Sequence, residues 1–416
     1  MFCMEENKKN ILIVGNSAIS TTLANKLREN KSIGEIFIAP NPCVENDNFK
    51  SVDIREDDLT GLLKFALENE INLTIPTSEK AIKADIVSFF QENGQNIFGP
   101  TKDASKITYN KIYGKKFLYK IHAITSKFGT FDKLQAAEDW IKNAKFPLLI
   151  RTAESSIHGD RLVCPTISLA SEFLNTLFTK GENEVLTEEF TMGHNFTVYY
   201  ITDCYSAVPI TTVANYKFAQ DGDGGLWTNG MGCFAPDYKI SETVLNRIQN
   251  IVNNTLSSLE KRGIPYFGIL GVDCTLVEED KFVVNEFKPF FQDFDASAIL
   301  NLISDDLIKI MFKCIEGLFA DEYEEIKTND YSSVSAVVYS RQINKKIKGI
   351  ENIDNDRNLA FINVKKCLNG DLLTSIGANF VLTRTASTLN RAKTYLYEDL
   401  AEIKFDGIKY RNDICK

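Results

Sequence analysis

The order of strand-like and helix-like segments in the first hundred residues constrains the fold more than any other feature. Short β-rich runs at residues 11–14 and 35–39 alternate with helix-like segments such as residues 20–30, in which Leu23 and Leu27 share one face. The alternation continues with residues 59–70 (helix), 72–75 (strand), 81–92 (helix) and 95–98 (strand). Strands that alternate with helices of this length predict a parallel, doubly wound sheet.

A ligand site is expected where the strands of such a sheet end. Ligands bind beyond the carboxyl ends of the strands, which in this chain means near Gly15 and Asn16, near Pro40 and near Thr77. The first hundred residues therefore predict one edge of a binding site.

The sequence changes character after Pro100, and three domains are predicted, over residues 1–100, 101–325 and 326–416. The middle domain is expected to be α+β, and the last to be a small accessory domain of mixed β and α structure. The segments expected after Pro100 are residues 103–119 (helix), 147–209 (strand-rich), 215–236 (a turn-rich loop), 241–261 (helix), 267–277 and 281–287 (strands), and 296–319 (helical).

Composition excludes several classes of protein. Of the 416 residues, 44% are hydrophobic and 25% are charged, the balance of a globular chain, and no run is apolar enough for a membrane helix. The net charge of −9 argues against a nucleic-acid partner, because phosphate contacts need clustered Lys and Arg. The nine cysteines form no C-x-x-C pair, and no signal segment is visible at the start of the chain. We therefore expect a cytoplasmic protein without nucleic-acid or membrane partners.

Two carboxylates form the strongest local signal for chemistry. Asp273 lies in one predicted strand and Glu286 in the next, and a tight acidic turn joins the two strands. Carboxylates on adjacent strands that point from one face can share Mg²⁺, which prefers oxygen ligands. The alternative is that one or both are ordinary solvent-facing strand residues.

A glycine-rich segment and two cations suggest where an anion binds. Five glycines lie between Gly222 and Gly232, and their backbone N–H groups can cradle a phosphate or carboxylate, although a surface loop is the alternative. Lys111 and Arg151 are candidate phosphate cations, although isolated cations are commonly solvated surface charges. The histidines show no metal or nucleophile pattern, and no catalytic residue is identified.

Several segments, in order, resemble the phosphoribosylamine–glycine ligase family, also called glycinamide ribonucleotide synthetase. The resemblance covers nearly the whole chain, and its specificity comes from the order and spacing of the segments. They are residues 11–16 (ILIVGN), 96–101 (NIFGPT), 110–111 (NK), 116–118 (KFL), 186–190 (LTEEF) with Gly193, 230–236 (GMGCFAP), 374–382 (TSIGANFVL), 391–392 (RA) and 405–414 (FDGIKYRNDI).

The resemblance implies an ATP-grasp fold in which two α+β lobes hold ATP with Mg²⁺ or Mn²⁺. ATP would phosphorylate the carboxylate of glycine, and the amine of phosphoribosylamine would then attack the acyl phosphate. By position, the implied ATP-binding residues are Lys111, Arg151, Glu188, Glu189 and Phe190. The expected substrate-binding residues are Asp221, Asp223, Asn229, Gly230 and Asp293. The implied metal ligands are Glu286 and Asp273.

The chain departs from the family pattern at positions that carry chemistry. The flap expected after Arg151 keeps one glycine, in the segment TAESSIHGDR at residues 152–161, and lacks its lysine unless Arg161 substitutes. Lys288 stands where the family has a metal-binding Asn, and Phe290 stands where it has a substrate-binding Arg. The ribose-binding carboxylate expected after Gly193 is absent, and residues 17–20 (SAIS) replace a Gly-Arg-rich substrate loop.

Three functional hypotheses follow from this pattern. The first is a divergent ligase that joins phosphoribosylamine and glycine in purine biosynthesis. The second is an ATP-grasp ligase with a different carboxylate and amine pair. The third is a nucleotide-binding pseudoenzyme that retains the fold as a scaffold. In each case the partners are small molecules, and the chain acts as a monomer or a homodimer.

Overall fold

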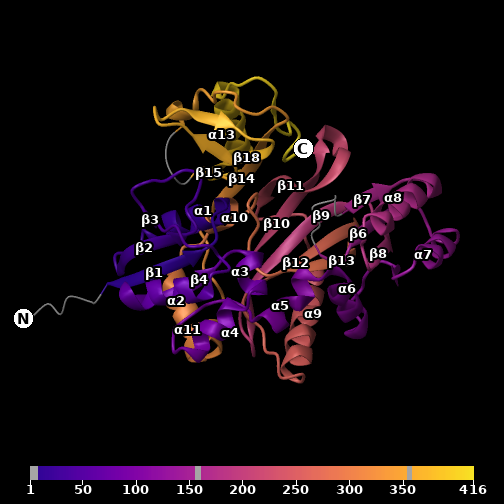
Figure 1. Cartoon of the computed structure of the whole chain (residues 1–416), viewed down its shortest axis with the longest axis horizontal. Helices are drawn as coiled ribbons and strands as arrows, with labels where there is room; N and C mark the ends of the chain where they lie inside the picture. The colour runs from indigo at the N-terminus through magenta and orange to yellow at the C-terminus, as the bar shows by residue number, and fades with distance from the viewer. Residues whose placement is uncertain (1–7, 155–160, 354–357) are drawn as a thin grey trace, which may run out of the picture.

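The structure is a computed structural model that describes residues 8–154, 161–353 and 358–416. Figure 1 shows the N-terminal part on one side of a long central sheet, a smaller lobe on the other side, and the C-terminal part above the sheet. The central sheet therefore joins the parts of the molecule and positions the groups that lie between them.

The N-terminal part is built on a parallel sheet. Its four described strands are ordered β3-β2-β1-β4. Ile11 and Ile13 pack in one hydrophobic cluster with Leu23, whereas Leu12 and Val14 pack in a second one on the other face. The predicted doubly wound sheet is confirmed. Its elements are β1 (Lys9–Val14), α1 (Ala18–Leu27), β2 (Ile33–Ala39), β3 (Lys50–Ser51), α2 (Leu59–Glu68), β4 (Ile71–Pro76), α3 (Glu79–Lys83) and α4 (Ile86–Glu92).

Three of the segments predicted within the first 120 residues differ in the structure. The helix predicted over residues 81–92 is divided into α3 and α4, because Asp85 adopts a left-handed conformation with φ 68°. The strand predicted over residues 95–98 is reduced to a parallel bridge between Thr74 and Ile97. The helical stretch over residues 103–119 is divided at Asn110, whose extended backbone and side chain cap the second helix. The two helices are α5 (Lys102–Tyr109) and α6 (Lys111–Lys120).

The smaller lobe is an antiparallel sheet covered by two helices. Within the described residues its strand order is β5-β8-β6-β7. Helix α8 lies inside the segment that the sequence predicts to be strand-rich, and Thr166 caps its start. The elements are β5 (Phe128–Phe131), α7 (Leu134–Ile141), β6 (Leu148–Thr152), β7 (Arg161–Cys164), α8 (Ile167–Thr179) and β8 (Val185–Glu189).

The central sheet begins with five antiparallel strands of the middle part. They are β9 (His194–Asp203), β10 (Ala207–Gln220), β11 (Gly224–Ala235), β12 (Phe267–Glu278) and β13 (Lys281–Lys288), in the order β13-β12-β9-β10-β11. The turn-rich loop predicted over residues 215–236 is wrong, because most of it forms the hairpin of β10 and β11. Gly230 serves packing in that hairpin: its φ is +153°, and an added Cβ would lie 2.3 Å from the ring of Phe294.

The C-terminal residues extend the same sheet. Strand β14 pairs with β11, and β18 and β15 follow it, so the described sheet runs unbroken from β13 to β15. The remaining elements are α9 (Glu242–Glu260), α10 (Ala296–Leu300), α11 (Leu307–Glu316), α12 (Phe319–Glu322), β14 (Ser332–Ser340), β15 (Leu359–Phe361), β16 (Val364–Lys366), β17 (Leu372–Thr374), β18 (Gly377–Ala386), α13 (Leu389–Glu402) and β19 (Ile408–Lys409). None of the helices in the described ranges is long and apolar enough to cross a membrane.

Candidate active site

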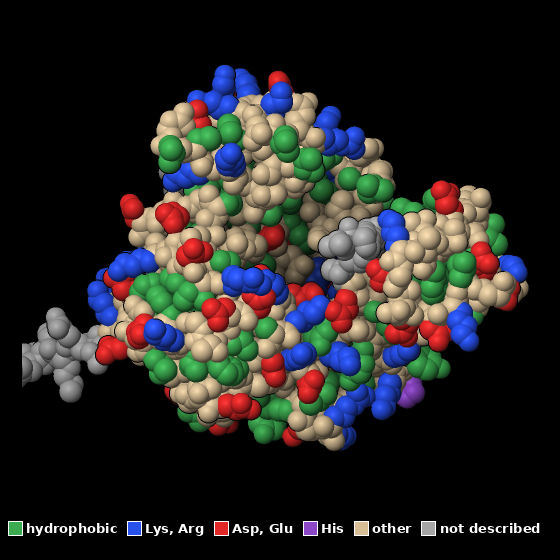
Figure 2. All heavy atoms as spheres, in the orientation of Figure 1, with side chains coloured by type: hydrophobic (Ala, Val, Ile, Leu, Met, Phe, Trp, Pro, Cys, Tyr) green, Lys and Arg blue, Asp and Glu red, His purple; other side chains and the backbone are tan. Residues whose placement is uncertain are grey.

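A small polar pocket of about 30 Å³ lies between the smaller lobe and the central sheet. Strands β6 and β8 of the lobe supply one wall, and strands β10 to β13 of the central sheet supply the other. Its lining residues are Ser126, Leu149, Arg151, Glu188, Glu189, Phe190, Thr191, Lys217, Trp227, Thr275, Asn285 and Glu286. Figure 2 shows that this face of the molecule is hollowed between the C-terminal part and the rest, with Lys, Arg, Asp and Glu side chains along the lower edge of the hollow.

Lys111 and Arg151 meet at Glu286. The guanidinium of Arg151 donates to Glu286 Oε2 at 2.9 Å, and Lys111 Nζ lies 3.2 Å from the same oxygen. The three side chains come from β6, from the start of α6 and from β13, so the contact joins both lobes. Burial alone would raise the pKa of Glu286, but Lys111, Arg151, Lys217 and Lys288 lower it well below its usual range. Glu286 is therefore ionised at neutral pH.

A second carboxylate, Glu188, binds cations from both sides. Lys115 Nζ lies 2.5 Å from Glu188 Oε2, and Arg151 Nη2 lies 3.1 Å from Glu188 Oε1. All three side chains are less than a tenth exposed. Arg151 Nε is buried without a hydrogen-bond partner among the described residues. Arg151 therefore has one buried donor that its two carboxylate partners leave unmet, which is energetically costly.

Aromatic side chains enclose one end of the pocket. Phe190 follows β8, and its ring packs edge-on against Trp227, with centroids 4.9 Å apart, and against Phe218 at 6.2 Å. Trp227 packs against Phe218 at 5.1 Å, and Lys217 Nζ lies 5.2 Å from the Trp227 ring. Rings beside the backbone of residues 188–191 provide the apolar surface and the hydrogen-bonding edge that a heteroaromatic base requires.

Asp273 is the most crowded acceptor of the site. Lys217 Nζ contacts its Oδ1 at 2.5 Å and its Oδ2 at 2.6 Å, and Lys288 Nζ lies 3.0 Å from Oδ2. Asn285 donates to Oδ1 at 2.9 Å, and Thr197 donates to Oδ2 at 3.4 Å. Burial raises the pKa of Asp273, but Lys217 and Lys288 outweigh it and lower that pKa. The carboxylate is ionised and surrounded by donors.

The predicted metal pair is adjacent, but both oxygens of Asp273 and Oε2 of Glu286 hold protein cations. Asp273 and Glu286 are register partners on β12 and β13, as the sequence suggests. Each carboxylate binds two protein cations. Among the described residues there is no group of three His, Cys, Asp or Glu side chains that could hold a metal ion. The crowded Asp273 does not fit a divalent ion, and the metal role of the pair stays a prediction.

Four of the predicted substrate residues, Gly230 among them, lie in or beside the β10–β11 hairpin but do not line the pocket. Asp221 accepts from the backbone of Asn412 at 2.8 Å, and Asp223 binds Arg411 at 2.8 Å. Asn229 accepts a hydrogen bond from Arg161 at the edge of β7. The structure thus gives Asp221 and Asp223 partners in the C-terminal tail and Asn229 a partner in the smaller lobe.

The side chain of Asp293, from the segment after β13, contacts the N-terminus of helix α1. Its Oδ1 accepts from the backbone N–H of Ile19 at 3.2 Å, so the carboxylate faces the positive end of the helix. Burial raises the pKa of Asp293, although its hydrogen bonds to residues 17–19 oppose that shift. The side chain therefore links the central part to the N-terminal part at the strand end where the sequence predicts a ligand.

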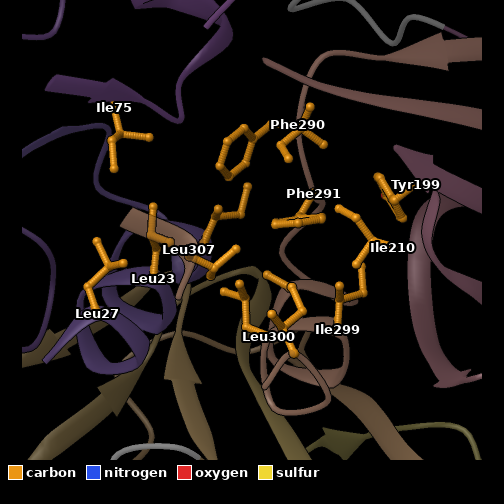
Figure 3. Close-up of a cluster of buried hydrophobic side chains, with 14 of the residues drawn as sticks. Leu23, Leu27, Ile75, Tyr199, Ile210, Phe290, Phe291, Ile299, Leu300 and Leu307 are labelled. Carbon is orange, nitrogen blue, oxygen red and sulfur yellow. The ribbon is translucent and has the colours of Figure 1, made fainter. Parts of the chain in front are cut away.

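Phe290, which stands in place of the expected arginine, is a core residue. Its side chain is only 4% exposed. Figure 3 shows it beside Phe291, in a cluster with Leu23, Ile75 and Leu307. These residues come from the N-terminal part and from the segment after β13, so Phe290 holds the two together and offers no charge to a substrate.

The structure reveals several site residues that the sequence reasoning missed. Lys115, Lys217, Trp227 and Asn285 reach the site from α6, β10, β11 and β13. Lys217 was missed because residues 215–236 were interpreted as a loop, although the run AVPITTVANYKF that contains it is rich in strand-forming residues. Glu154, in the segment that follows Arg151, is ion-paired with Lys83. Residues 155–160 of the predicted flap, including His158, lie outside the described residues.

The chain matches two models of one family. Residues 9–108 match the phosphoribosylglycinamide synthetase N domain, and residues 109–296 match the phosphoribosylglycinamide synthetase ATP-grasp (A) domain. The phosphoribosylamine–glycine ligase of Lactococcus lactis is 28% identical over 407 residues, which are 97% of this chain and 98% of that protein.

Solved structures give the same result for the fold. The crystal structure of phosphoribosylamine–glycine ligase from Thermotoga maritima is similar with a TM-score of 0.81 and 20% identity, over 98% of this chain and 100% of that one. The biotin carboxylase–β-γ-ATP complex from Campylobacter jejuni has a TM-score of 0.69 and 14% identity, over 97% and 93% of the two chains. The two family-model matches, which together cover residues 9–296, show that the chain is an ATP-grasp protein of the phosphoribosylglycinamide synthetase family.

Proposed function

We propose that this chain is an ATP-dependent ligase that joins glycine to phosphoribosylamine through an acyl phosphate. The observation that carries the proposal is the meeting of Lys111 and Arg151 at Glu286, beside an aromatic-walled pocket between two lobes. Full-length relatives that are phosphoribosylamine–glycine ligases support the same reaction.

The base and the phosphates of ATP would bind at different parts of this site. The rings of Phe190 and Trp227 would cover the adenine, and the backbone near Glu188 and Glu189 would meet its edge. Lys111 and Arg151 would bind phosphate oxygens, because charge-assisted hydrogen bonds are strong in a buried site.

The chemistry would proceed in two displacements. A glycine carboxylate oxygen attacks the γ-phosphorus of ATP, the bond to the β–γ bridging oxygen breaks, and ADP leaves. The amine nitrogen of phosphoribosylamine then attacks the acyl carbon, loses a proton and expels inorganic phosphate. Lys111 and Arg151 would offset charge on the transferred group, and closure of the lobes would exclude water. Magnesium has no step here, because the carboxylates predicted to bind it hold protein cations.

The direct test is ADP release from ATP with glycine and freshly prepared phosphoribosylamine. We expect sustained ADP release only when both substrates are present, because the acyl phosphate formed from glycine needs the amine to turn over. Lys111→Met should raise the KM for ATP about tenfold or more, because it removes a phosphate cation. The matched control is Lys116→Met on the same helix, whose side chain is 54% exposed and paired with Glu184. Substrate-independent ADP release, or equal effects of the two substitutions, would contradict the assignment.

One observation favours a second candidate. Because Phe290 is buried where the family resemblance predicts a substrate-binding arginine, the amine partner could differ from phosphoribosylamine while the acyl-phosphate chemistry is retained. A panel of amines and carboxylates in the same ADP assay separates the two candidates. Turnover with another pair, and none with glycine and phosphoribosylamine, would establish the second.

A further inference from the structure

The strongest unexplained feature of the pocket is that its acidic residues are already neutralised. Lys217 and Lys288 bind Asp273, whereas Lys111 and Arg151 bind Glu286. Mg²⁺ requires oxygen ligands at about 2.0–2.1 Å in octahedral geometry, so its protein ligands need free lone pairs. The availability of those lone pairs therefore decides whether the site can bind the ion.

Asp273 has no lone pair to give. A carboxylate offers about four acceptor positions. Its Oδ1 receives Lys217 and Asn285, and its Oδ2 receives Lys217, Lys288 and Thr197, all within 3.4 Å. The residue is also fully buried. A divalent ion would have to displace an ammonium group that itself has no solvent to move into, since Lys217 and Lys288 are each less than a tenth exposed.

The ion-paired cluster already carries an excess of positive charge. Among the described residues its five cations are Lys111, Lys115, Arg151, Lys217 and Lys288, and its three carboxylates are Glu188, Asp273 and Glu286. The excess among these eight side chains is two positive charges, and two neighbouring carboxylates reduce it: Asp295, which acts on Lys288, and Glu79, which acts on Lys111 and Glu286. A buried excess of charge is unfavourable unless a counter-ion neutralises it. A polyphosphate in the adjoining pocket would supply that negative charge.

We propose that this pocket binds the polyphosphate of ATP without a divalent ion held by the protein. Lys217 and Lys288, fixed on Asp273, hold the charge that a metal would otherwise bring. The inference rests on the proposed function, because ATP is the ligand. The inference goes beyond the proposed function because it makes the affinity for ATP independent of Mg²⁺. It replaces the prediction that Glu286 and Asp273 bind a metal ion.

The test is calorimetric titration of the full chain with ATP, once in excess EDTA and once in MgCl₂. We expect the two dissociation constants to agree within about threefold. A loss of more than about tenfold in EDTA would overturn the inference and leave the proposed function standing. Absence of ATP binding in both buffers would overturn the proposed function and the inference with it.

Lys288→Asn tests whether the ion pair of Lys288 with Asp273 takes the place of a metal ion. The substitution frees an Asp273 oxygen and removes one positive charge, so we expect ATP affinity in EDTA to fall about tenfold and Mg²⁺ to restore it. The matched control is Lys281→Asn on the same strand, whose side chain is 75% exposed. Equal EDTA affinity for wild type and Lys288→Asn would overturn the inference.

A second readout does not depend on the stability of the variant. Electron paramagnetic resonance of Mn²⁺ measures free ion directly, and we expect the wild-type chain without nucleotide to leave added Mn²⁺ free. Stoichiometric binding of Mn²⁺ by the wild-type chain would show that the carboxylates are available to a metal, and the inference would fail.

Discussion

At the scale of single residues, Asp295 makes the stability of the folded protein depend on pH. Tyr199 donates to its Oδ2 at 2.7 Å, and the backbone of Gln292 donates to its Oδ1 at 2.7 Å. Burial raises the pKa of Asp295 to about 6, even though Lys288 lowers it. In the unfolded chain an aspartate has a pKa of about 3.9. The folded protein therefore keeps a proton on Asp295 over a pH range in which the unfolded chain has lost it.

Raising the pH through that range should cost stability. Below about pH 4 the carboxyl is protonated in both states, and above about pH 6 it is ionised in both, so the loss falls between these values. Relative to Asp295→Asn, which cannot ionise, the wild type should lose about 2 kcal/mol of unfolding free energy between pH 4.5 and 7.5. Urea unfolding of both proteins at both pH values measures the difference. A difference that does not change with pH would contradict the assignment.

The sequence could supply some of the site residues but not their partners. Lys111, Arg151 and Glu286 are candidates from the local sequence to which the family resemblance gives roles, and the structure brings all three together. Lys115 and Lys217 carry no local signal, because a lysine in a helix or strand is commonly a solvated charge. Only the packing of α6 and β10 against the site makes them buried partners of Glu188 and Asp273.

Among the elements, the C-terminal tail holds the hairpin that carries Lys217 and Trp227. Arg411 donates to the Phe218 carbonyl at 3.2 Å and to Asp223 at 2.8 Å, and its guanidinium also binds Asp413. The Arg411 side chain is 1% exposed. Figure 1 shows the hairpin of β10 and β11 extending toward the C-terminus. The tail therefore fixes one wall of the pocket from outside it.

Loosening this contact should change the surroundings of Trp227. In a Trp140→Phe background Trp227 is the only tryptophan of the chain, since the sequence has two. Arg411→Met in that background should increase quenching of Trp227 by acrylamide and weaken ATP binding about threefold or more, because the hairpin loses its anchor. Lys409→Met, an exposed change in the same tail, is the control. Unchanged quenching in Arg411→Met would show that the tail does not position the hairpin.

The hydrophobic pattern of the sequence predicts those helices and strands whose buried residues recur at the spacing of the element. The alternation of β1, α1 and β2 follows directly from hydrophobic periodicity. The β10–β11 hairpin was missed because Gly224, Gly225, Gly230 and Gly232 suggest a loop, whereas in the structure they lie within β11. Gly230 and Gly232 give room for Phe294 and Ile414, contacts that depend on distant parts of the chain.

Across the whole molecule, one continuous sheet joins the site to the C-terminal part. Strand β14 pairs with β11, so residues 326–416 extend the sheet whose other strands carry Asp273, Glu286 and Lys217. Sequence position suggested a separate accessory domain, because strand pairing between distant segments leaves no local signal. Phe290 packs the N-terminal part against the segment that follows β13. The N-terminal part, the central sheet and the C-terminal part therefore all support the pocket.

The measurement that tests the account most directly follows oxygen from glycine to phosphate. Glycine labelled with ¹⁸O in its carboxylate is incubated with the protein, ATP and phosphoribosylamine, and the products are analysed by mass spectrometry. An acyl-phosphate ligase transfers a carboxylate oxygen to the departing phosphate, so each amide formed should yield inorganic phosphate with one ¹⁸O atom. Amide formed with unlabelled phosphate, or no amide despite bound ATP, would contradict the proposed reaction.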